Sequence, residues 1–203
     1  MAIGTYLAFA FVLLLFSYIV FRMLVRRDYR NHARLRPLAS VAQLLVFFAL
    51  MCFPYLFNPP EWPWFWRLPG SASLAIQRIG IGLICFGFIV SFGTMGWFGM
   101  GKAFGLNITG LTKQGPYRFS RNPQILGGYL LVIGTAIQWH SIHSYGWIFF
   151  YALITHWMVI TEEEHLRRVF GDEYEAYCLK VPRYLLPLRC KVGNSLSGNK
   201  SGG

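Results

Sequence analysis

The sequence predicts an all-α, polytopic membrane helix bundle with about five transmembrane helices plus a C-terminal amphipathic helix. Of its 203 residues, 55% are hydrophobic and only 13% are charged, whereas soluble domains carry about 25% charged residues. The apolar residues are gathered in long runs, and the basic residues lie in the gaps between these runs. Lipid is therefore the expected solvent for most of the chain.

The first two apolar runs cover about residues 3–25 and 38–57. A helix of roughly 20 residues covers about 30 Å, so each run is long enough to span a bilayer. The first run is too long for the core of a signal peptide and has no basic segment before it. The second run ends at Asn58 and two prolines, which stop a helix.

The next three apolar runs cover about residues 74–98, 125–139 and 145–160. The first of these contains several glycines, and small residues let helices pack closely in lipid. The other two are short for full spans, so we expect them to pack as a tight helical hairpin. From Thr161 to Val181, apolar residues recur every three or four positions, which predicts an amphipathic helix at the membrane surface or docked against the bundle.

The basic residues predict the orientation of the chain in the membrane. They concentrate in the segments after the first, third and fifth runs, whereas the loop after the second run has only Arg67 and the turn after the fourth has none. With five spans, every basic segment lies in the cytoplasm, as the positive-inside rule requires. We therefore expect a multi-pass protein with its N-terminus outside and its C-terminus cytoplasmic, in a bacterial inner membrane or the endoplasmic reticulum.

The net charge of +11 comes from these same segments, so it indicates contact with anionic membrane lipids and argues against a nucleic-acid partner. The four cysteines form no C-x-x-C pair, and His140 and His143 lie in a polar turn. Neither a disulfide framework nor a metal site is expected from them. We expect a single integral membrane domain over residues 1–191, followed by a disordered Gly/Ser/Asn-rich tail over 192–203.

Two polar segments are expected on the cytoplasmic face, residues 115–124 before the fourth run and residues 162–165 after the fifth. The predicted hairpin between them brings a cationic cluster and an acidic cluster together at the mouth of the bundle. S-adenosylmethionine fits this mixture, because its carboxylate binds arginine or backbone N–H groups and its ammonium and ribose hydroxyls bind carboxylates. Methyl transfer is an in-line displacement in which the sulfonium loses its charge, so positioning can supply much of the catalysis.

Simpler interpretations of these segments stay open. Arg118 and Arg121 also fit ordinary arginines at the membrane interface. The three glutamates from position 162 also fit a solvated helix start, and two of them lie four residues before Arg167 and Arg168, at a spacing typical of helix ion pairs. The segment 96–103 mimics a phosphate-binding loop but lacks the Ser/Thr after its lysine and follows a membrane helix.

Two paired motifs in the second half of the chain resemble a known family. The first motif is Gly115-Pro116-Tyr117-Arg118, then Arg121-Asn122-Pro123 and Gly127. The second motif is Glu162-Glu163, Leu166, Phe170-Gly171, Tyr174, Tyr177, Val181-Pro182-Arg183 and Pro187. In order, spacing and position relative to the last two runs, they are similar to the isoprenylcysteine carboxyl methyltransferase and phospholipid N-methyltransferase superfamily of integral membrane methyltransferases.

This resemblance implies that S-adenosylmethionine binds in a cofactor half of the bundle, about residues 95–187. It implies that the cofactor pocket contains Tyr117, Arg121, Asn122, Pro123, Glu162 and Glu163. Two positions depart from the family pattern, since Asn122 stands where many members have histidine and Ile125 stands where tyrosine is common. An asparagine cannot act as a general base near neutral pH, so a mechanism that needs an imidazole there is in question.

The leading hypothesis is methyl transfer from S-adenosylmethionine to a membrane-partitioned, lipid-like or small hydrophobic acceptor at the cytoplasmic face. An NADPH-dependent membrane reductase of the sterol-reductase type is an alternative, because such proteins have a similar C-terminal half but tend to have more spans. A non-catalytic scaffold or lipid-binding protein is another alternative. The sequence leaves open whether the acceptor is a prenylated cysteine carboxylate, a phospholipid amine, a small thiol or another hydrophobic metabolite.

Overall fold

The computed structural model describes residues 3–32, 34–57, 74–98 and 110–185, and within these ranges all regular structure is helical, as expected for an all-α protein. The predicted tail over 192–203 and the glycine-containing segment 99–109 lie outside the described residues. The elements are α1 (Ile3–Tyr18), the π-helix η1 (Ile19–Val25), α2 (Arg26–His32), α3 (Pro37–Cys52), the 3₁₀ turn η2 (Phe53–Leu56), α4 (Leu74–Phe98), the 3₁₀ turn η3 (Gly115–Arg118), α6 (Pro123–Trp139) and α7 (Ile142–Lys180).

Three helical stretches within the described ranges are long and apolar enough to cross a membrane, namely Ile3–His32, Pro37–Leu56 and Leu74–Trp97. The protein is therefore a multi-pass helical membrane protein. α6 has only 17 residues, fewer than the roughly 20 of a full crossing, and α7 carries charged residues in its second half. The expectation that these two helices also cross the membrane stays a prediction.

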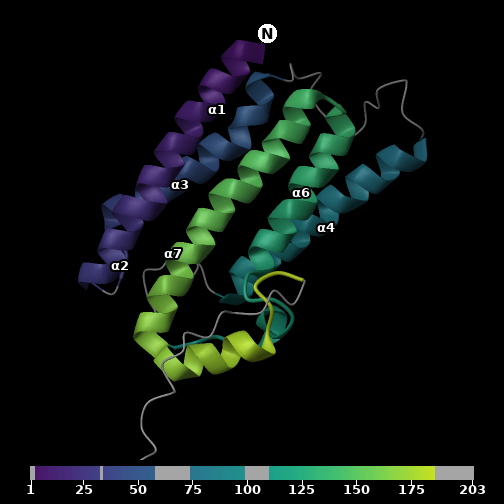
Figure 1. Ribbon diagram of the computed structural model, residues 1–203. Coiled ribbons are helices and arrows are strands. Elements are labelled where there is room, and N and C mark those ends of the chain that lie inside the picture. The colour runs from purple at the N-terminus through teal and green to yellow at the C-terminus, as the bar shows by residue number, and fades with distance from the viewer. Residues whose placement is uncertain (1–2, 33, 58–73, 99–109, 186–203) are drawn as a thin grey trace, which may run out of the picture.

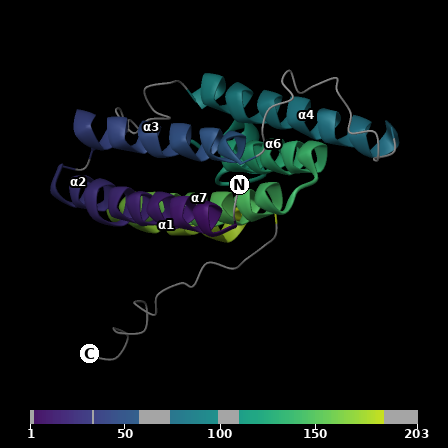
Figure 2. The ribbon, with the colours of Figure 1, turned by 90° about the horizontal axis from the view of Figure 1, so that it is seen from above.

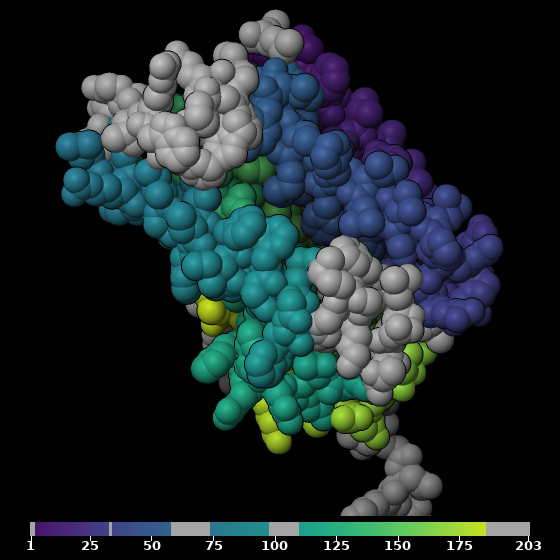
Figure 3. Space-filling view, turned by 180° about the vertical axis from the view of Figure 1, so that it is seen from behind, coloured from purple at the N-terminus to yellow at the C-terminus, as the bar shows by residue number. Residues whose placement is uncertain are grey.

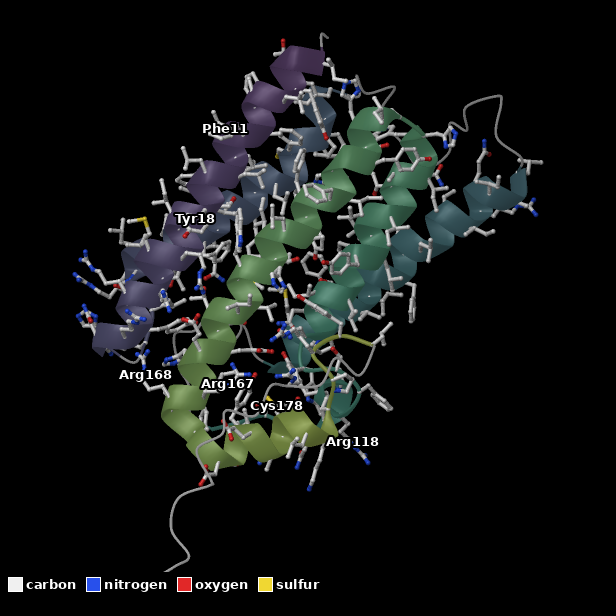
Figure 4. All side chains as sticks on the ribbon, in the orientation of Figure 1. Phe11, Tyr18, Arg118, Arg167, Arg168 and Cys178 are labelled. Atoms are coloured by element: carbon white, nitrogen blue, oxygen red, sulfur yellow. The ribbon has the colours of Figure 1, made fainter. Side chains whose placement is uncertain are left out.

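The apolar surface of α1 shows how the bundle meets lipid. Tyr6, Ala10 and Leu13 are buried against the bundle at helical spacing. The opposite face exposes large side chains such as Phe11, which is 66% exposed. Figure 4 shows Phe11 pointing away from the neighbouring helices. In water an apolar surface of this kind would promote aggregation, whereas the hydrocarbon of a bilayer solvates it.

α7 is the central helix of the bundle, with α1 and α3 on one side and α6 and α4 on the other (Figure 1). Seen from above, α1 and α7 share one layer, and α3 and α4 lie in a second layer with α6 between (Figure 2). The Trp147 indole on α7 donates a hydrogen bond of 2.8 Å to the Leu50 carbonyl of α3. This bond fixes the two layers against each other at a fully buried position.

Glycines allow α4 and α6 to cross in close contact. A Cβ atom added at Gly87 would lie 2.5 Å from the Gly127 carbonyl oxygen, and one at Gly134 would lie 2.6 Å from the Gly80 carbonyl oxygen. The expectation that small residues mediate close packing is confirmed at these positions. Gly93, in the same predicted run, has open space around it and makes no such contact.

The hairpin predicted between the last two apolar runs is present. α6 ends at His140, which adopts a left-handed conformation, and Ser141 and Ser144 form a reciprocal capping box that starts α7. The change from apolar to amphipathic sequence at Thr161 does not interrupt the helix. Instead, α7 changes direction at Gly171, whose φ of 45° and ψ of −123° are not helical. The remaining segment runs across the lower end of the bundle in Figure 1.

Candidate functional site

A cavity of about 250 Å³ lies where α3, α4, α6 and α7 meet the turn η3. Its polar lining comes from six side chains on these elements: Gln43, Ser91, Tyr117, Gln124, Tyr151 and Glu162. The rest of the wall is apolar and includes Leu44, Phe47, Met51, Leu131 and Met158. A cavity with apolar walls and a few polar groups is the usual form of a small-molecule site.

The polar and apolar parts of the wall are separated along the helix axes. On α7 the lining residues Glu162, Met158 and Tyr151 lie on one face at spacings of one and then two turns, and the Tyr151 hydroxyl donates a hydrogen bond to the Ile125 carbonyl. On α6 the polar Gln124 is at the start of the helix and Leu131 is two turns further on. The polar end of the cavity is therefore beside η3, and the apolar end extends toward the middle of the bundle.

The cavity lies between two helices that diverge. From behind, α3 and α4 separate, and the green atoms of α6 and α7 are visible in the hollow between them (Figure 3). The lining residues Leu44 on α3 and Phe92 on α4 belong to helices whose outer faces are strongly apolar. An apolar molecule in the surrounding lipid could therefore reach the cavity between these two helices.

Glu162 contributes a carboxylate to the polar end of the cavity. Its side chain is half-buried, and it forms no hydrogen bond or ion pair with any described residue. Burial raises the pKa of Glu162 to about 7, with a further contribution from the neighbouring Glu163 carboxylate. The group therefore lies between its two protonation states near neutral pH, beside a space that could hold a cation.

Tyr117 forms the adjoining wall of the cavity. Its hydroxyl donates a 3.3 Å hydrogen bond to the Gln124 side-chain oxygen. Its backbone carbonyl accepts a 2.7 Å hydrogen bond from the Tyr177 hydroxyl, so the turn η3 is fixed to the last segment of α7. Burial, followed by the negative charge of Glu162, raises the pKa of Tyr117 well above its ordinary value. Tyr117 is therefore a neutral aromatic wall at physiological pH.

Glu163, the next residue along α7, points to a different place. Its carboxylate contacts three guanidinium groups: Arg121 at 2.9 Å, Arg183 at 2.6 Å and Arg167 at 3.7 Å. The Glu163 and Arg121 side chains are 4% and 3% exposed. A buried pair of this kind holds only because the charges are also hydrogen-bonded.

Arg121 connects the 115–124 segment to the end of α7. Its Nη1 donates to the Tyr174 hydroxyl at 3.2 Å and contacts the Cys178 sulfur at 2.7 Å. Burial lowers the pKa of Arg121, but the Glu163 carboxylate together with Tyr174 and Cys178 more than offsets this, so the pKa lies above its ordinary value. Its Nε is buried and has no hydrogen-bond partner among the described residues.

Asn122 makes a second connection between the same segments. Its side-chain amide donates to the Arg183 carbonyl at 3.1 Å, and the neighbouring backbone N–H of Arg121 donates to the Pro182 carbonyl at 3.0 Å. Pro123 then begins α6 at a position where its missing N–H costs nothing. These contacts clamp the 115–124 segment onto residues 182–183.

Glu164 points to a third side of α7, different from the sides of Glu162 and Glu163. Successive helical residues are about 100° apart, so three consecutive glutamates face three different neighbours. Glu164 accepts hydrogen bonds from Arg22 Nη1 at 3.0 Å and Arg26 Nε at 2.6 Å, and these bonds lower its pKa despite partial burial. Within the described ranges it pairs with these two arginines rather than with Arg168, the partner that the i, i+4 spacing suggested.

The residues predicted from the sequence therefore fall into two groups. Tyr117 and Glu162 line the cavity. The other four form the clamp beside it or start the next helix: Arg121, Asn122, Glu163 and Pro123. Gln43 was not predicted from the sequence, where the only indication of a role is that a polar side chain lies inside an apolar run.

The polar and aromatic groups present fit the cofactor that the sequence suggests. The Glu162 carboxylate, which no described residue pairs with, suits a cationic group, and Tyr117 with the apolar walls suits a flat ring. The unpartnered, buried Nε of Arg121 is a hydrogen-bond donor that an anionic group could satisfy.

Comparison with known proteins adds one match. Residues 75–173 match the model of a family described as phospholipid methyltransferase. No curated protein and no solved structure matches the chain. The matched range runs from the start of α4 to the last segment of α7, and it includes five of the six polar residues that line the cavity, with Gln43 outside it.

Proposed function

Because the chain belongs to the phospholipid methyltransferase family, and is thus a membrane methyltransferase that uses S-adenosylmethionine, we propose that it methylates a lipid-like acceptor that enters its cavity from the bilayer. The observation that carries this proposal is the cavity itself. Its walls are apolar at one end, and at the other end they surround the carboxylate of Glu162, which has no hydrogen-bond or ion-pair partner among the described residues. Such a space suits an amphiphile whose polar group meets a cationic cofactor.

Glu162 and Tyr117 would contact the cofactor directly. The cofactor supplies an electrophilic methyl group on a sulfonium, which becomes neutral as the methyl leaves. The ionised Glu162 carboxylate would hold a cationic part of the cofactor in a poorly hydrated site, where electrostatic attraction is stronger than in water. Tyr117, held by Gln124 and Tyr177, would provide the aromatic wall.

Arg121, Asn122 and Glu163 would act on the cofactor through the clamp. Their contacts with Arg183 and Tyr174 fix the turn η3 and the start of α6. Fixed positions matter because alignment of the methyl donor and the acceptor is the main catalytic requirement. The unpartnered Arg121 Nε is the one atom of the clamp that supports a direct contact with an anionic group of the cofactor.

The apolar walls and the separation of α3 from α4 support an acceptor that arrives from lipid. Its polar end would lie near Glu162 and its hydrocarbon along Phe47 and Leu131. Exclusion of water by these walls would protect the methyl donor from hydrolysis. A water-soluble acceptor would gain nothing from this arrangement.

We further propose that the site faces the cytoplasm. Arg118, Arg167 and Arg168 lie at the same end of the bundle in Figure 4, as does the arginine-rich α2 in Figure 1. The positive-inside rule assigns this end to the cytoplasm. Five crossings, with the N-terminus outside, are consistent with this arrangement.

The direct test is a methyl-transfer assay with the full chain in nanodiscs that contain a natural phospholipid mixture. Radiolabelled methyl from S-adenosylmethionine should appear in the lipid extract, and mass spectrometry should identify the methylated species. Calorimetric titration should show saturable binding of S-adenosylhomocysteine and none of NADPH. Label confined to the aqueous phase would contradict a lipid-like acceptor, and binding of NADPH alone would favour the reductase alternative.

A further inference from the structure

Gln43 is a buried polar residue with no hydrogen-bond partner among the residues that the structure describes. It lies on α3 in the middle of an apolar run, and its side chain lines the cavity. The residue is only 6% exposed. Within the described ranges, it forms no hydrogen bond or ion pair.

Another buried glutamine in a comparable position does form a hydrogen bond within the protein. Gln138 on α6 is 8% exposed, and its Nε2 donates a 2.8 Å hydrogen bond to the Gln77 carbonyl of α4. A buried amide that lacks such a partner destabilises a protein, and polar residues in apolar spans are mostly functional. Gln43 therefore points to a ligand as its missing partner.

The position of Gln43 along α3 indicates which part of a ligand it would meet. It lies six residues after Pro37, about 9 Å along the helix axis, and arginines precede Pro37 at the membrane surface. At this depth the polar headgroups of a bilayer give way to hydrocarbon. Phe47 and Met51 follow on the same face of α3 and line the apolar end of the cavity.

Gln43 and Glu162 are two polar side chains at one end of a single cavity, and neither has a hydrogen-bond partner within the described ranges. Glu162 comes from α7 and Gln43 from α3, so the two helices approach a bound molecule from different sides. An ionised carboxylate is only a hydrogen-bond acceptor, whereas an amide N–H is a donor. The two side chains therefore suit different atoms, one cationic or protonated and the other an oxygen.

We propose that Gln43 positions the methyl acceptor by donating a hydrogen bond from its amide to an ester or phosphate oxygen of an amphiphilic lipid. The inference rests on the proposed function and names the class of its substrate. The hydrocarbon of this lipid lies along Phe47 and Met51, and its reactive group lies beyond Gln43 toward Glu162. A pure hydrocarbon or a small soluble thiol offers no such oxygen and is a poor acceptor.

The test compares full-length wild type with Gln43→Met, which keeps the length of the side chain and removes the amide. The probes are phosphatidylethanolamine and its monomethyl derivative, titrated in mixed micelles at saturating S-adenosylmethionine. We expect at least a fivefold rise in KM for the lipid that the wild type methylates, with kcat changed less than twofold. The dissociation constant for S-adenosylhomocysteine should stay within twofold of wild type.

Thermal unfolding separates a positioning role from a structural one. Because Gln43 has no hydrogen-bond partner in the described part of the chain, Gln43→Met should keep or raise the midpoint of unfolding. Gln43→Asn, which retains the amide on a shorter side chain, should have an intermediate KM. Gln138→Met is the matched control, and it should lower the midpoint but leave the lipid KM unchanged.

The outcomes distinguish this inference from the proposed function. If the wild type methylates a lipid and Gln43→Met has the wild-type KM, the positioning role is wrong and the proposed function stands. A lowered midpoint of Gln43→Met with an unchanged KM would assign Gln43 to the structure alone. If the wild type methylates no lipid in micelles or nanodiscs, both the proposed function and the role of Gln43 are wrong.

Discussion

The Glu163 carboxylate lies 2.9 Å from the Arg121 guanidinium in a buried ion pair that joins α7 to the segment before α6. The same carboxylate binds Arg183, so one side chain connects three parts of the chain that are distant in sequence. Residues expected to contact a cofactor therefore bind one another and hold the segment before α6 against the end of α7. The consequences for stability and for binding can be measured separately.

Removing one partner of the buried pair should destabilise the protein. Arg121→Ala leaves Glu163 with one fewer charge partner in a buried place, and breaking such a pair typically costs about 3–5 kcal/mol. We expect a clearly lower midpoint of thermal unfolding in detergent. Lys113→Ala is the control, because it breaks an exposed pair with Glu173 that is worth at most about 1 kcal/mol. Equal midpoints for the two variants would contradict the structural role of the clamp.

Glu162→Gln should behave in the opposite way. The carboxylate has no partner among the described residues, so the variant should fold and should be no less stable than the wild type. We expect its dissociation constant for S-adenosylmethionine to rise at least tenfold at pH 8, which corresponds to about 1.4 kcal/mol. Calorimetric titration of both proteins measures this difference. Wild-type affinity in the variant would remove Glu162 from the cofactor site.

The affinity for the cationic cofactor should depend on pH through the same residue. Because the pKa of Glu162 is raised to about 7, the carboxyl is neutral at pH 5.5 and ionised at pH 8.5. We expect wild-type affinity to rise across this range, with most of the change between pH 6 and pH 8. Glu162→Gln should show a flatter profile. Parallel profiles for the two proteins would assign the pH dependence to another group.

The stability of the ligand-free protein should follow the opposite trend. A raised pKa means that the folded state binds a proton more tightly than the unfolded state, in which Glu has its ordinary value of about 4.3. Stability contributed by Glu162 is therefore greatest at low pH and is lost as pH rises through about 7. The midpoint of Glu162→Gln minus that of wild type should increase from pH 5 to pH 8. A constant difference would show that burial does not shift this group.

Close packing of α4 on α6 should tolerate no added methyl group at Gly87. A Cβ atom there would lie 2.5 Å from the Gly127 carbonyl oxygen and 2.6 Å from the Leu131 backbone nitrogen. Gly87→Ala should therefore lower the midpoint of unfolding, since overpacking costs about 1–3 kcal/mol. Gly93→Ala, on the same helix but with open space around it, should leave the midpoint unchanged or raise it. Similar effects of the two substitutions would argue against the observed crossing.

The sequence correctly predicted the helices and the close approach of the two polar segments, 115–124 and 162–165. Apolar runs long enough to span lipid predicted α1, α3 and α4, and the short fourth and fifth runs predicted the hairpin of α6 and α7. It was a weaker guide to the site, because it placed Glu162 and Glu163 in one pocket. The structure separates them, since adjacent residues on a helix face directions about 100° apart.

What the sequence by itself determined is local: which stretches are apolar, where helices stop, and that the 115–124 and 162–165 segments lie at one end of the bundle. Only the tertiary structure decided which neighbour covers each face. It paired Glu163 with Arg121 and Glu164 with Arg22 and Arg26, and it left Glu162 and Gln43 facing a shared cavity. Periodicity specifies the residues that share a helix face, whereas the partner of that face depends on the angle and depth at which helices cross. Here contacts between distant glycines and a bend at Gly171 set those crossings.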